Sequence, residues 1–301
     1  MKTLLLVDGN ALLYRAFFAL PDFSKGIGVP TNAIHGFIGM LHKAITDYAP
    51  THVAVCFDSP GPRLRNEISP TYQQHRTKAP DSLVSQMALA REMLIAAGIP
   101  YLEAPGYEAD DILGTLSEKY KKEYKILILT GDKDILQLVD KQVTVIMLKT
   151  GLSKVVEFTP EKVVEEFGIN PEQIPDYKSL MGDASDGYKG VDGIGPKTAM
   201  TLLQKYKTIE QILAETANLT PDRVRIAISA QSDNATLCKR LAVIVRNMPL
   251  DFDISKSEFT GYDNDLKQFL ITYRFRTTYK RLFNEEFPEI AKDPGQDRLF
   301  E

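Results

Sequence analysis

The chain has 301 residues, of which 44% are apolar and 25% charged, a balance typical of globular rather than disordered proteins. The sequence has no apolar run of the roughly 18 residues that a membrane span needs, and its start lacks the long apolar stretch of a cleavable signal, so we expect a cytoplasmic protein with no membrane partner. Cys56 and Cys238 are the only cysteines and lie far apart, which argues against a disulfide framework and a zinc site. A net charge of −4 argues against a protein that coats nucleic acid non-specifically, but it allows local basic patches.

The first half of the sequence alternates short apolar runs with helical patterns. An apolar stripe that opens at Pro80-Asp81-Ser82 and closes at Gly98 predicts one clear helix. Strands are predicted at residues 4–7, 52–57, 101–103, 125–129 and 143–148. Mostly unbroken apolar runs of this kind are buried on both faces of a parallel sheet. Residues 1–165 are therefore predicted to form an α/β domain, with a mainly parallel central sheet and helices on both faces.

The pattern changes after a last apolar run at residues 155–158. Thr159-Pro160-Glu161 carries the N-cap, the proline and the acidic first turn of a helix, and the periods that follow are helical, without a convincing strand. We therefore predict a second, helical domain over residues 166–285. Residues 286–301 are acidic and contain proline and glycine, which predicts a tail or the start of a linker.

Carboxylates follow four consecutive predicted strands. They are Asp8; Asp58; Glu108, Asp110 and Asp111; and Asp132 and Asp134. Because the carboxyl ends of parallel strands share one sheet edge, where open α/β folds build their sites, we expect these seven side chains to converge. Any one of them alone could equally be a helix N-cap or a turn residue. Together they would repel one another unless cations neutralised them, and oxygen-only ligands select Mg²⁺ or Mn²⁺.

The spacing of these acids sets conditions on the local structure. Asp132 and Asp134 point the same way if their segment is extended, and Glu108 and Asp110 both reach the edge only if a helix begins between them. The helical half adds a pair three residues apart, Asp183 and Asp186, which either joins the same edge or belongs to a surface turn. Two hard ions about 4 Å apart can activate water and stabilise the leaving oxygen in phosphodiester cleavage, so the nine acids predict a two-metal site.

A glycine-rich turn directly follows the acidic pair. In Gly190–Ala199, the Gly193-Ile194-Gly195 turn would let a phosphate approach backbone N–H groups at the start of the next helix, and Lys197 adds a charge. Four lysines against Asp192 give residues 189–207 a local charge of +3: Lys189, Lys197, Lys205 and Lys207. The pattern indicates a helix-hairpin-helix that grips a duplex, near residues 187–206, although tight turns between helices also need glycine without any ligand.

A second basic stretch covers residues 62–80 and directly follows Asp58. It sets Arg63, Arg65, Arg76 and Lys78 against Glu67 alone, and it includes Tyr72 and His75. Its prolines predict an irregular excursion from the sheet edge, so that its charges could meet a strand entering the site. The alternative is a solvated loop with ordinary surface charge. Arg15, on the helix after Asp8, could also reach the site or simply face solvent.

These motifs together resemble the 5′-nuclease (flap endonuclease) family, and most closely the N-terminal 5′→3′ exonuclease domain of bacterial DNA polymerase I. The matching blocks occur in family order between residue 4 and about residue 283. They are Leu6-Val7-Asp8-Gly9-Asn10 with Tyr14-Arg15-Ala16-Phe17, Phe57-Asp58 with Gly61 and Arg65, Gly106 to Asp111, Thr130 to Asp134 with Gln137-Leu138, and Gly182-Asp183 with Ser185-Asp186, Gly193-Ile194-Gly195 and Lys197-Thr198-Ala199.

The resemblance implies a two-metal nuclease that cuts DNA where a duplex meets a 5′ single-stranded flap. It assigns Asp8, Asp58, Glu108, Asp110 and Asp111 to a first metal region, and Asp132, Asp134, Asp183 and Asp186 to a second. Arg15, Arg65 and Arg76 match residues that engage the scissile strand, and residues 62–80, with Tyr72 and Lys78, match the arch under which the 5′ end threads. The hairpin, with Lys189, Gly193, Gly195, Lys197 and Thr198, would hold the duplex, together with a monovalent cation such as K⁺.

Two positions depart from the family pattern. The family has Tyr-Lys-x-x-Arg in the arch, whereas this chain has Gln73 in place of the lysine, a change that removes a charge which Lys78 or Arg63 could replace. The family usually continues Asn-x-Pro-Gly after the acidic pair, whereas this chain has Gly187-Tyr188-Lys189-Gly190.

The leading hypothesis is a Mg²⁺-dependent, structure-selective 5′-nuclease of replication and repair, associated with the bacterial nucleoid. It would remove displaced flaps and RNA primers by hydrolysis, leaving a 5′-phosphate and a 3′-hydroxyl, with a polymerase module in the same chain as one candidate partner. The alternative is a catalytically weak module that binds branched DNA, which Gln73 favours. A third hypothesis is a phosphatase with an acidic sheet edge, for which the duplex-binding hairpin has no use.

Overall fold

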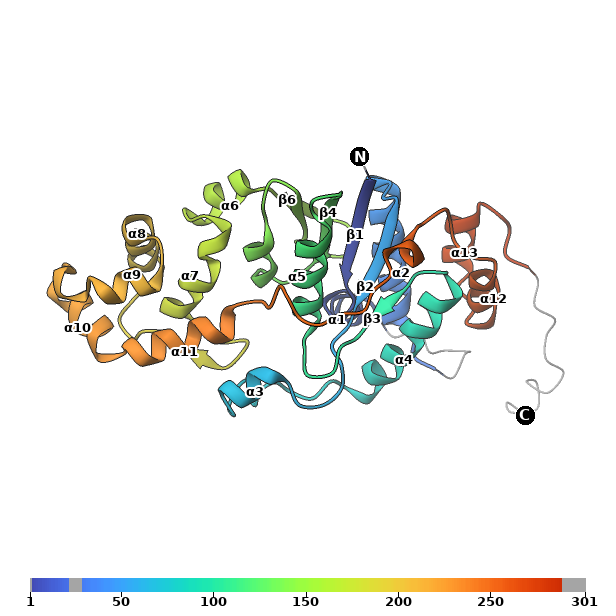
Figure 1. Cartoon of the computed structure of the whole chain (residues 1–301). Helices are drawn as coiled ribbons and strands as arrows, with labels where there is room; N and C mark the ends of the chain where they lie inside the picture. The colour runs from blue at the N-terminus through green and yellow to red at the C-terminus, as the bar shows by residue number, and fades with distance from the viewer. Residues whose placement is uncertain (1, 22–28, 289–301) are drawn as a thin grey trace.

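The computed structural model describes residues 2–21 and 29–288. A six-stranded sheet with the order β3-β2-β1-β4-β5-β6 lies at the centre of the molecule (Figure 1). The strands are β1 (Lys2–Asp8), β2 (His52–Cys56), β3 (Tyr101–Leu102), β4 (Tyr124–Thr130), β5 (Val143–Leu148) and β6 (Val155–Phe158). All neighbours pair in parallel except β6, which runs antiparallel to β5. The predicted mainly parallel α/β sheet is confirmed.

The apolar runs of the strands cover both faces of the sheet. Alternate residues of β1 belong to different cores: Leu4 and Leu6 pack with α5 (Ala109–Tyr120), whereas Leu5 and Val7 pack with α1 (Gly9–Ala19), α2 (Asn32–Tyr48) and α4 (Asp81–Ala96). Successive strand side chains point to opposite faces, so a strand covered on both sides must be apolar throughout. This double burial fixes the carboxyl edge of the sheet in place.

The second half of the chain is mainly helical. Its helices are α6 (Pro160–Phe167), α7 (Ile174–Met181), α8 (Pro196–Tyr206), α9 (Ile209–Ala214), α10 (Asp222–Ala230) and α11 (Ser232–Ala242), and α8, α9 and α10 lie at one end of the molecule (Figure 1). Two strands of two residues, β7 (Gly182–Asp183) and β8 (Tyr188–Lys189), pair antiparallel where no strand was expected. Leu180, Leu203 and other apolar residues of this half join the core on the α5 face of the sheet, so the two halves share one core.

The last two helices return to the α/β half. After α11 the chain crosses the molecule to α12 (Asp265–Thr272) and α13 (Arg276–Phe283), which lie at the end opposite α10 (Figure 1). Phe269 and Tyr279 of these helices pack with α2 and α4. The predicted helical domain of residues 166–285 thus includes two helices that lie away from the predicted DNA-binding hairpin. The predicted tail lies, from residue 289 on, outside the described residues.

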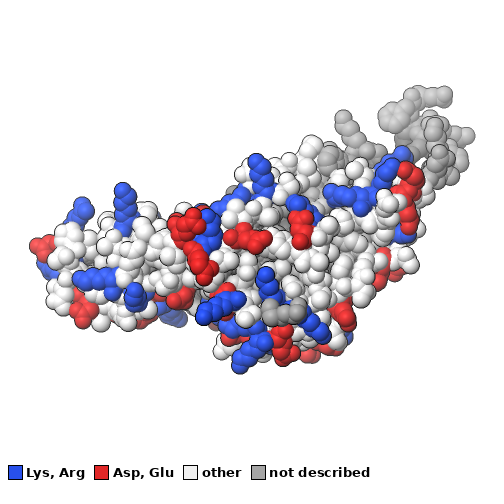
Figure 2. All heavy atoms as spheres, turned by 90° about the horizontal axis from the view of Figure 1, so that it is seen from above, with Lys and Arg blue, Asp and Glu red and all other residues white. Residues whose placement is uncertain are grey.

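Charge is mixed over the face of the molecule seen from above, where Lys and Arg side chains are interspersed with Asp and Glu along its length (Figure 2). The mixed charge on this face agrees with the small net charge of the chain. None of the helices in the described ranges is long and apolar enough to cross a membrane.

Candidate active site

Asp8 ends β1 and lies at the carboxyl edge of the sheet. Its Oδ1 accepts a hydrogen bond from the Ala11 backbone N–H (2.9 Å), which caps α1, and its Oδ2 accepts one from the Thr130 hydroxyl at the end of β4 (2.7 Å). Burial, followed by the charges of Asp132 and Asp58, raises the pKa of Asp8 to about 7 despite these two donors. The carboxylate is therefore desolvated and crowded by other negative charges.

Asp110 lies in the first turn of α5, which begins at Ala109. The helix thus starts between Glu108 and Asp110, as the convergence of both acids requires. Burial raises the pKa of Asp110 well above its ordinary value, and the charges of Asp132 and Asp8 raise it further. We call Asp8, Asp110 and Asp132 the central group, since within the described ranges none of the three forms an ion pair with a lysine or arginine.

Asp132 and Asp134 point the same way, but not from an extended segment. Asp134 begins the 3₁₀-helix η1 (Asp134–Leu138), and its backbone N–H donates to Asp132 Oδ1 (2.8 Å). The Asp132 N–H in turn donates to the Thr130 hydroxyl (2.9 Å). The backbone here is not extended, because an Asp side chain readily bonds the N–H two residues on and turns the chain. Burial and the charge of Asp132 raise the pKa of Asp134 to about 7.

The other acids of the sheet edge pair with arginines of the excursion. Arg63 bridges Asp58 Oδ2 and Glu108 Oε1 (both 2.8 Å), and Arg65 Nη1 contacts Glu108 Oε2 (2.6 Å) and Asp111 Oδ2 (2.8 Å). We call Asp58, Glu108 and Asp111 the arginine-paired group. Burial raises the pKa of Glu108, although the two arginines oppose that rise.

Arg65 is not available to a substrate strand as it lies. The side chain is buried, and its remaining donors reach Asp111 Oδ1 (2.9 Å) and the carbonyl oxygens of Leu241 and Val243 (both 3.0 Å). It therefore ties the short helix α3 (Leu64–Ile68) and α5 to the end of α11 and to the residue that follows it. The expected contact between Arg65 and the scissile strand does not fit this burial, because every donor group already has a protein acceptor.

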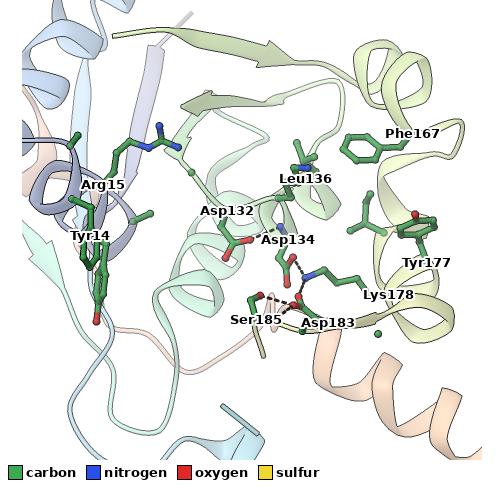
Figure 3. Close-up of a pocket in the computed structure, with 18 of the residues that line it drawn as sticks. Tyr14, Arg15, Asp132, Asp134, Leu136, Phe167, Tyr177, Lys178, Asp183 and Ser185 are labelled. Carbon is green, nitrogen blue, oxygen red and sulfur yellow. Dashed lines mark hydrogen bonds and ion pairs between the residues drawn. The ribbon is translucent and has the colours of Figure 1, made fainter. Parts of the chain in front are cut away.

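Arg15 also lies differently from the sequence expectation. Its guanidinium donates to the carbonyl oxygens of Leu148, Lys149 and Gly151 at distances of 3.0–3.1 Å, and it points toward the end of β5 rather than toward Asp132 (Figure 3). The three carbonyls compensate the charge without a carboxylate. Arg15 thus supports the strand end beside the acids, and any role against DNA requires it to leave these partners.

The second acidic pair does reach the sheet edge. Ligand oxygens of Asp134, Asp183 and Asp186 lie within 4.8 Å of one another. Lys178 of α7 forms ion pairs with Asp134 and Asp183 (Figure 3), and Asp186 contacts Arg76 (2.7 Å). Burial raises the pKa of Asp183, but the hydrogen bond and charge of Lys178 outweigh it, so the net pKa is lowered. We call Asp134 and Asp183, with Lys178 between them, the lysine-bridged pair.

The excursion of residues 62–80 contains α3 and then turns that dock on the loop after Asp183. The Gln73 N–H donates to the Asp186 carbonyl (2.9 Å), and His75 Nε2 lies 2.8 Å from the Ala184 carbonyl oxygen. Tyr72 is buried, and its hydroxyl contacts Glu108 (3.2 Å) and Asp186 (3.3 Å). The segment thus bridges the two halves above the acids. Tyr72 faces carboxylates in this position, whereas Lys78 is exposed.

Two clefts meet at the acids. One of about 1130 Å³ is lined by the central group, the arginine-paired Asp58 and Glu108, and the excursion with Arg76 and Lys78. The other, of about 990 Å³, is lined by the lysine-bridged pair and by Tyr14 and Arg15 of α1 (Figure 3). Both include Asp132 and Asp134. A strand laid across the acids would therefore have open space on both sides.

The glycine turn before α8 is open to solvent. Gly193 has φ +85°, a conformation that favours glycine, and no atom lies within 4 Å of the position where a Cβ would stand at Gly193 or Gly195. Lys197 and Thr198 lie in the first turn of α8, and Lys189 is exposed on β8. The segment before the turn is the short strand β8 rather than the expected helix, and α7 ends at Met181. Backbone N–H groups at the start of α8 can still donate hydrogen bonds to an approaching phosphate.

Three residues of the site escaped the sequence analysis. Thr130 links Asp8 to Asp132, and Lys178 bridges Asp134 and Asp183. The hydroxyl of Tyr188 is buried near the same acids and has no hydrogen-bond partner in the part of the chain that the structure describes. Burial and the charges of Asp134, Asp183 and Asp186 raise the pKa of Tyr188. Tyr188 lies in the segment, residues 187–190, where the sequence departs from the family pattern. Nothing in the sequence indicated that its side chain would point toward the acids.

Comparisons with known proteins decide the family. The 5′-3′ exonuclease N-terminal resolvase-like domain model matches residues 3–168, and the 5′-3′ exonuclease C-terminal SAM fold model matches residues 169–265. This chain belongs to the 5′-3′ exonuclease family. It is 38% identical to a 5′-3′ exonuclease of Aquifex aeolicus over 302 residues, which cover 100% of both chains. It is 40% identical to the DNA polymerase I of Caldicellulosiruptor bescii over 93% of this chain but only 33% of that protein.

The 5′-3′ exonuclease fold extends to more distant structures. The bacteriophage T5 5′-exonuclease with bound zinc matches with a TM-score of 0.70 at 18% identity, over 81% of this chain and 90% of the other. The T5 flap endonuclease in complex with DNA and metal ions matches with a TM-score of 0.67 at 16% identity, over 93% and 96%. These similarities show a shared fold. This chain spans about one third of the length of the DNA polymerase I relatives that it matches.

Proposed function

We propose that this member of the 5′-3′ exonuclease family is a divalent-metal-dependent nuclease that hydrolyses DNA, or an RNA primer, where a duplex meets a 5′ single strand. The observation that carries the proposal is the central group: two carboxylates at strand ends, Asp8 and Asp132, and one in the first turn of α5, Asp110, line one cleft, and no lysine or arginine of the described residues forms an ion pair with them. Desolvated carboxylates that raise one another's pKa are suited to bind a hard cation.

The residues present fit two Mg²⁺ or Mn²⁺ ions. Within this proposal, the central group would hold the first ion with help from Asp58 and Glu108, and Asp134, Asp183 and Asp186 would hold the second. Such ions activate water and stabilise the leaving oxygen of a phosphodiester. Asp111, whose carboxylate is fully engaged by Arg65 and the Val245 N–H (2.9 Å), would act by holding the edge in shape rather than as a ligand.

The chain's own residues would position the nucleic acid. The excursion and the loop after Asp183 enclose the acids, so a single strand can reach them but a continuous duplex cannot easily do so. Arg76 and Lys78 face the same cleft and can compensate phosphates there. The open turn at Gly193 and Gly195, with Lys197 and a monovalent cation such as K⁺, would hold the backbone of the neighbouring duplex. This proposal places the protein in the bacterial cytoplasm, acting in replication and repair, alone or joined to a polymerase module.

A cleavage assay with labelled oligonucleotides tests the proposal. Substrates with a 5′ flap, a nick and a blunt duplex end are incubated with Mg²⁺, with Mn²⁺ and with EDTA. We expect cleavage of the flap close to the junction, slower cleavage of the blunt duplex, and none in EDTA. Equal cleavage of all substrates, or cleavage that survives EDTA, would contradict it. The exposed control Glu165→Gln on α6 should cleave like the wild type.

The role of the hairpin has its own test. Replacing Lys197 by Ala should weaken duplex binding uniformly across sequences and reduce the slope of log K against log salt by about 1. The measurement is fluorescence anisotropy with a 5′-flap duplex in Ca²⁺ at several salt concentrations. An unchanged slope would show that Lys197 does not contact a phosphate.

The catalytically weak binding module remains the second candidate because of Gln73. In the structure its amide contacts Asp186 (2.8 Å) and Glu108 (3.3 Å), where the family's lysine would bring a positive charge. Tight binding of the flap substrate together with the absence of cleavage in Mg²⁺ and in Mn²⁺ would favour this candidate over the nuclease.

A further inference from the structure

Lys178 projects from α7 into the acidic edge and contacts carboxylates on both sides (Figure 3). It forms ion pairs with Asp134, at the start of η1, and with Asp183, in β7. Its side chain is only 15% exposed. Burial disfavours the ammonium form, but the two carboxylates outweigh that effect and raise the pKa of Lys178. The lysine is therefore a fixed positive charge of this edge.

The ammonium group lies where a divalent ion of this half of the site would have to lie. An ion bound by both Asp134 and Asp183 must stand between their oxygens, at about 2.1 Å from each for Mg²⁺. Lys178 already occupies the space between these oxygens. Two cations this close repel each other strongly in a partly desolvated site, so they cannot share the two carboxylates. Within residues 2–21 and 29–288, no lysine or arginine forms an ion pair with the central group.

Open space beside the lysine-bridged pair can hold the side chain of Lys178 once an ion displaces it. The cleft of about 990 Å³ beside the lysine-bridged pair is lined by Lys178 itself, Phe167, Tyr177 and Ser185. A lysine has a flexible four-carbon stem that can swing its charge into such a space while α7 stays in place.

We propose that Lys178 is a built-in counter-cation that a divalent ion must displace from between Asp134 and Asp183, so that this half of the site binds its ion more weakly than the central group does. Lys178 thereby holds Asp134 and Asp183 together before the ion arrives. The inference rests on the proposed function, since it presumes that ions bind at this edge.

Calorimetric titration of the whole chain with Mn²⁺, without DNA, measures both halves of the site. We expect the wild type to show one tighter and one weaker ion, and Lys178→Gln to tighten the weaker one by about 10-fold or more. The matched control is Lys133→Gln, since Lys133 lines the same cleft and lies over the Phe167 ring (5.9 Å) without contacting Asp134 or Asp183. This control removes the same charge and should change either affinity by less than about 3-fold.

A result in which Lys178→Gln leaves the weaker affinity equal to that of Lys133→Gln, or lowers it, overturns the inference. Two ions of equal affinity in the wild type overturn it as well, while the proposed nuclease function stands. Failure of all variants to bind Mn²⁺, together with the absence of flap cleavage, overturns the proposed function itself.

A second measurement keeps the inference testable if Lys178→Gln does not fold. In wild-type protein with ¹³C-labelled lysine, the Lys178 Cε signal, assigned with Lys178→Arg, is followed by NMR during addition of Mg²⁺. We expect it to move to the position of an exposed lysine in step with the weaker ion. A signal that stays in place while both ions bind contradicts displacement.

Discussion

The central group and the arginine-paired group are built from neighbouring residues but differ in charge balance. Asp110 and Asp111 are adjacent in α5. The charges of Asp132, Asp8 and Glu108 raise the pKa of Asp110, and no lysine or arginine of the described residues forms an ion pair with it, whereas Asp111 receives two donors from Arg65. Neighbouring acids repel a buried carboxylate that has no lysine or arginine partner, and a metal ion can relieve this repulsion. A carboxylate that is paired with an arginine instead stabilises the fold. Similar acids at one edge thus take opposite roles, which substitutions at the two groups can separate.

The largest expected effect comes from Asp110→Asn. The amide cannot replace a charged ligand of the ions, so we expect flap cleavage to fall by about 1,000-fold or more. The same variant should melt at a higher temperature than the wild type in EDTA, because a repelled charge is gone. Single-turnover cleavage and thermal melting measure the two effects. Cleavage within about 10-fold of the wild type would place Asp110 outside the metal site.

The neighbouring change Asp111→Asn should act on stability instead. It leaves the buried Arg65 without its main partner, and breaking a buried ion pair in this way costs about 3 kcal/mol. Urea unfolding measures this loss, and cleavage by the folded fraction should stay within about 10-fold of the wild type. Asp110→Asn makes the same isosteric change one residue away. Equal free energies of unfolding for Asp110→Asn and Asp111→Asn would contradict the distinction between the two groups.

Arg63 tests whether the arginine-paired group also serves the reaction. Its guanidinium donates to Gln73 and lies between Asp58 and Glu108, where it can supply the charge that Gln73 lacks. We expect Arg63→Gln to lower single-turnover cleavage by about 10-fold to 100-fold, and Gln73→Lys to restore much of it in that background. In the wild type, Gln73→Lys should give little gain. Equal effects of Gln73→Lys in both backgrounds would show that the two positions are independent.

The smallest expected effect concerns pH and the central group. Asp8 has a folded pKa of about 7, above its unfolded value, so in metal-free protein its stabilising contribution is present at low pH and is lost as pH rises toward 7. Asp8→Asn, which keeps an N-cap side chain, should therefore melt at about the wild-type temperature near pH 4, rise progressively above it between pH 4 and pH 7, and melt a few degrees above it at pH 7.5. Thermal melting in EDTA across this range tests the difference.

Metal should reverse that dependence. Mg²⁺ binds the ionised carboxylates, so the rise in melting temperature that millimolar Mg²⁺ produces should grow from pH 5 to pH 7.5. The Asn variants of Asp132 and Asp183 should show a smaller rise than the wild type. A rise that is independent of pH would contradict the raised pKa of Asp8.

Much of the edge was predictable because the signals behind it are local. Apolar runs located five of the six strands of the central sheet to within a few residues, and acids at the strand ends marked the edge. The start of α5 between Glu108 and Asp110 also followed from the requirement that both converge. The turn at Asp132 was missed, since an Asp side chain that bonds its own backbone competes with extended structure.

The amino-acid order alone determined the layers of this protein, the edge where its carboxylates gather and the family to which it belongs, since burial patterns and strand ends are read from neighbouring residues. Only the tertiary structure decided which carboxylate receives a cation. Arg65 lies 46 residues before Asp111, and Arg15 lies 133 residues before the Leu148 carbonyl that it binds. Lys178 reaches Asp134 from another helix. Such pairings depend on how distant segments pack. Because charge compensation acts through space, it produces no periodic pattern in the sequence from which the partners could be predicted.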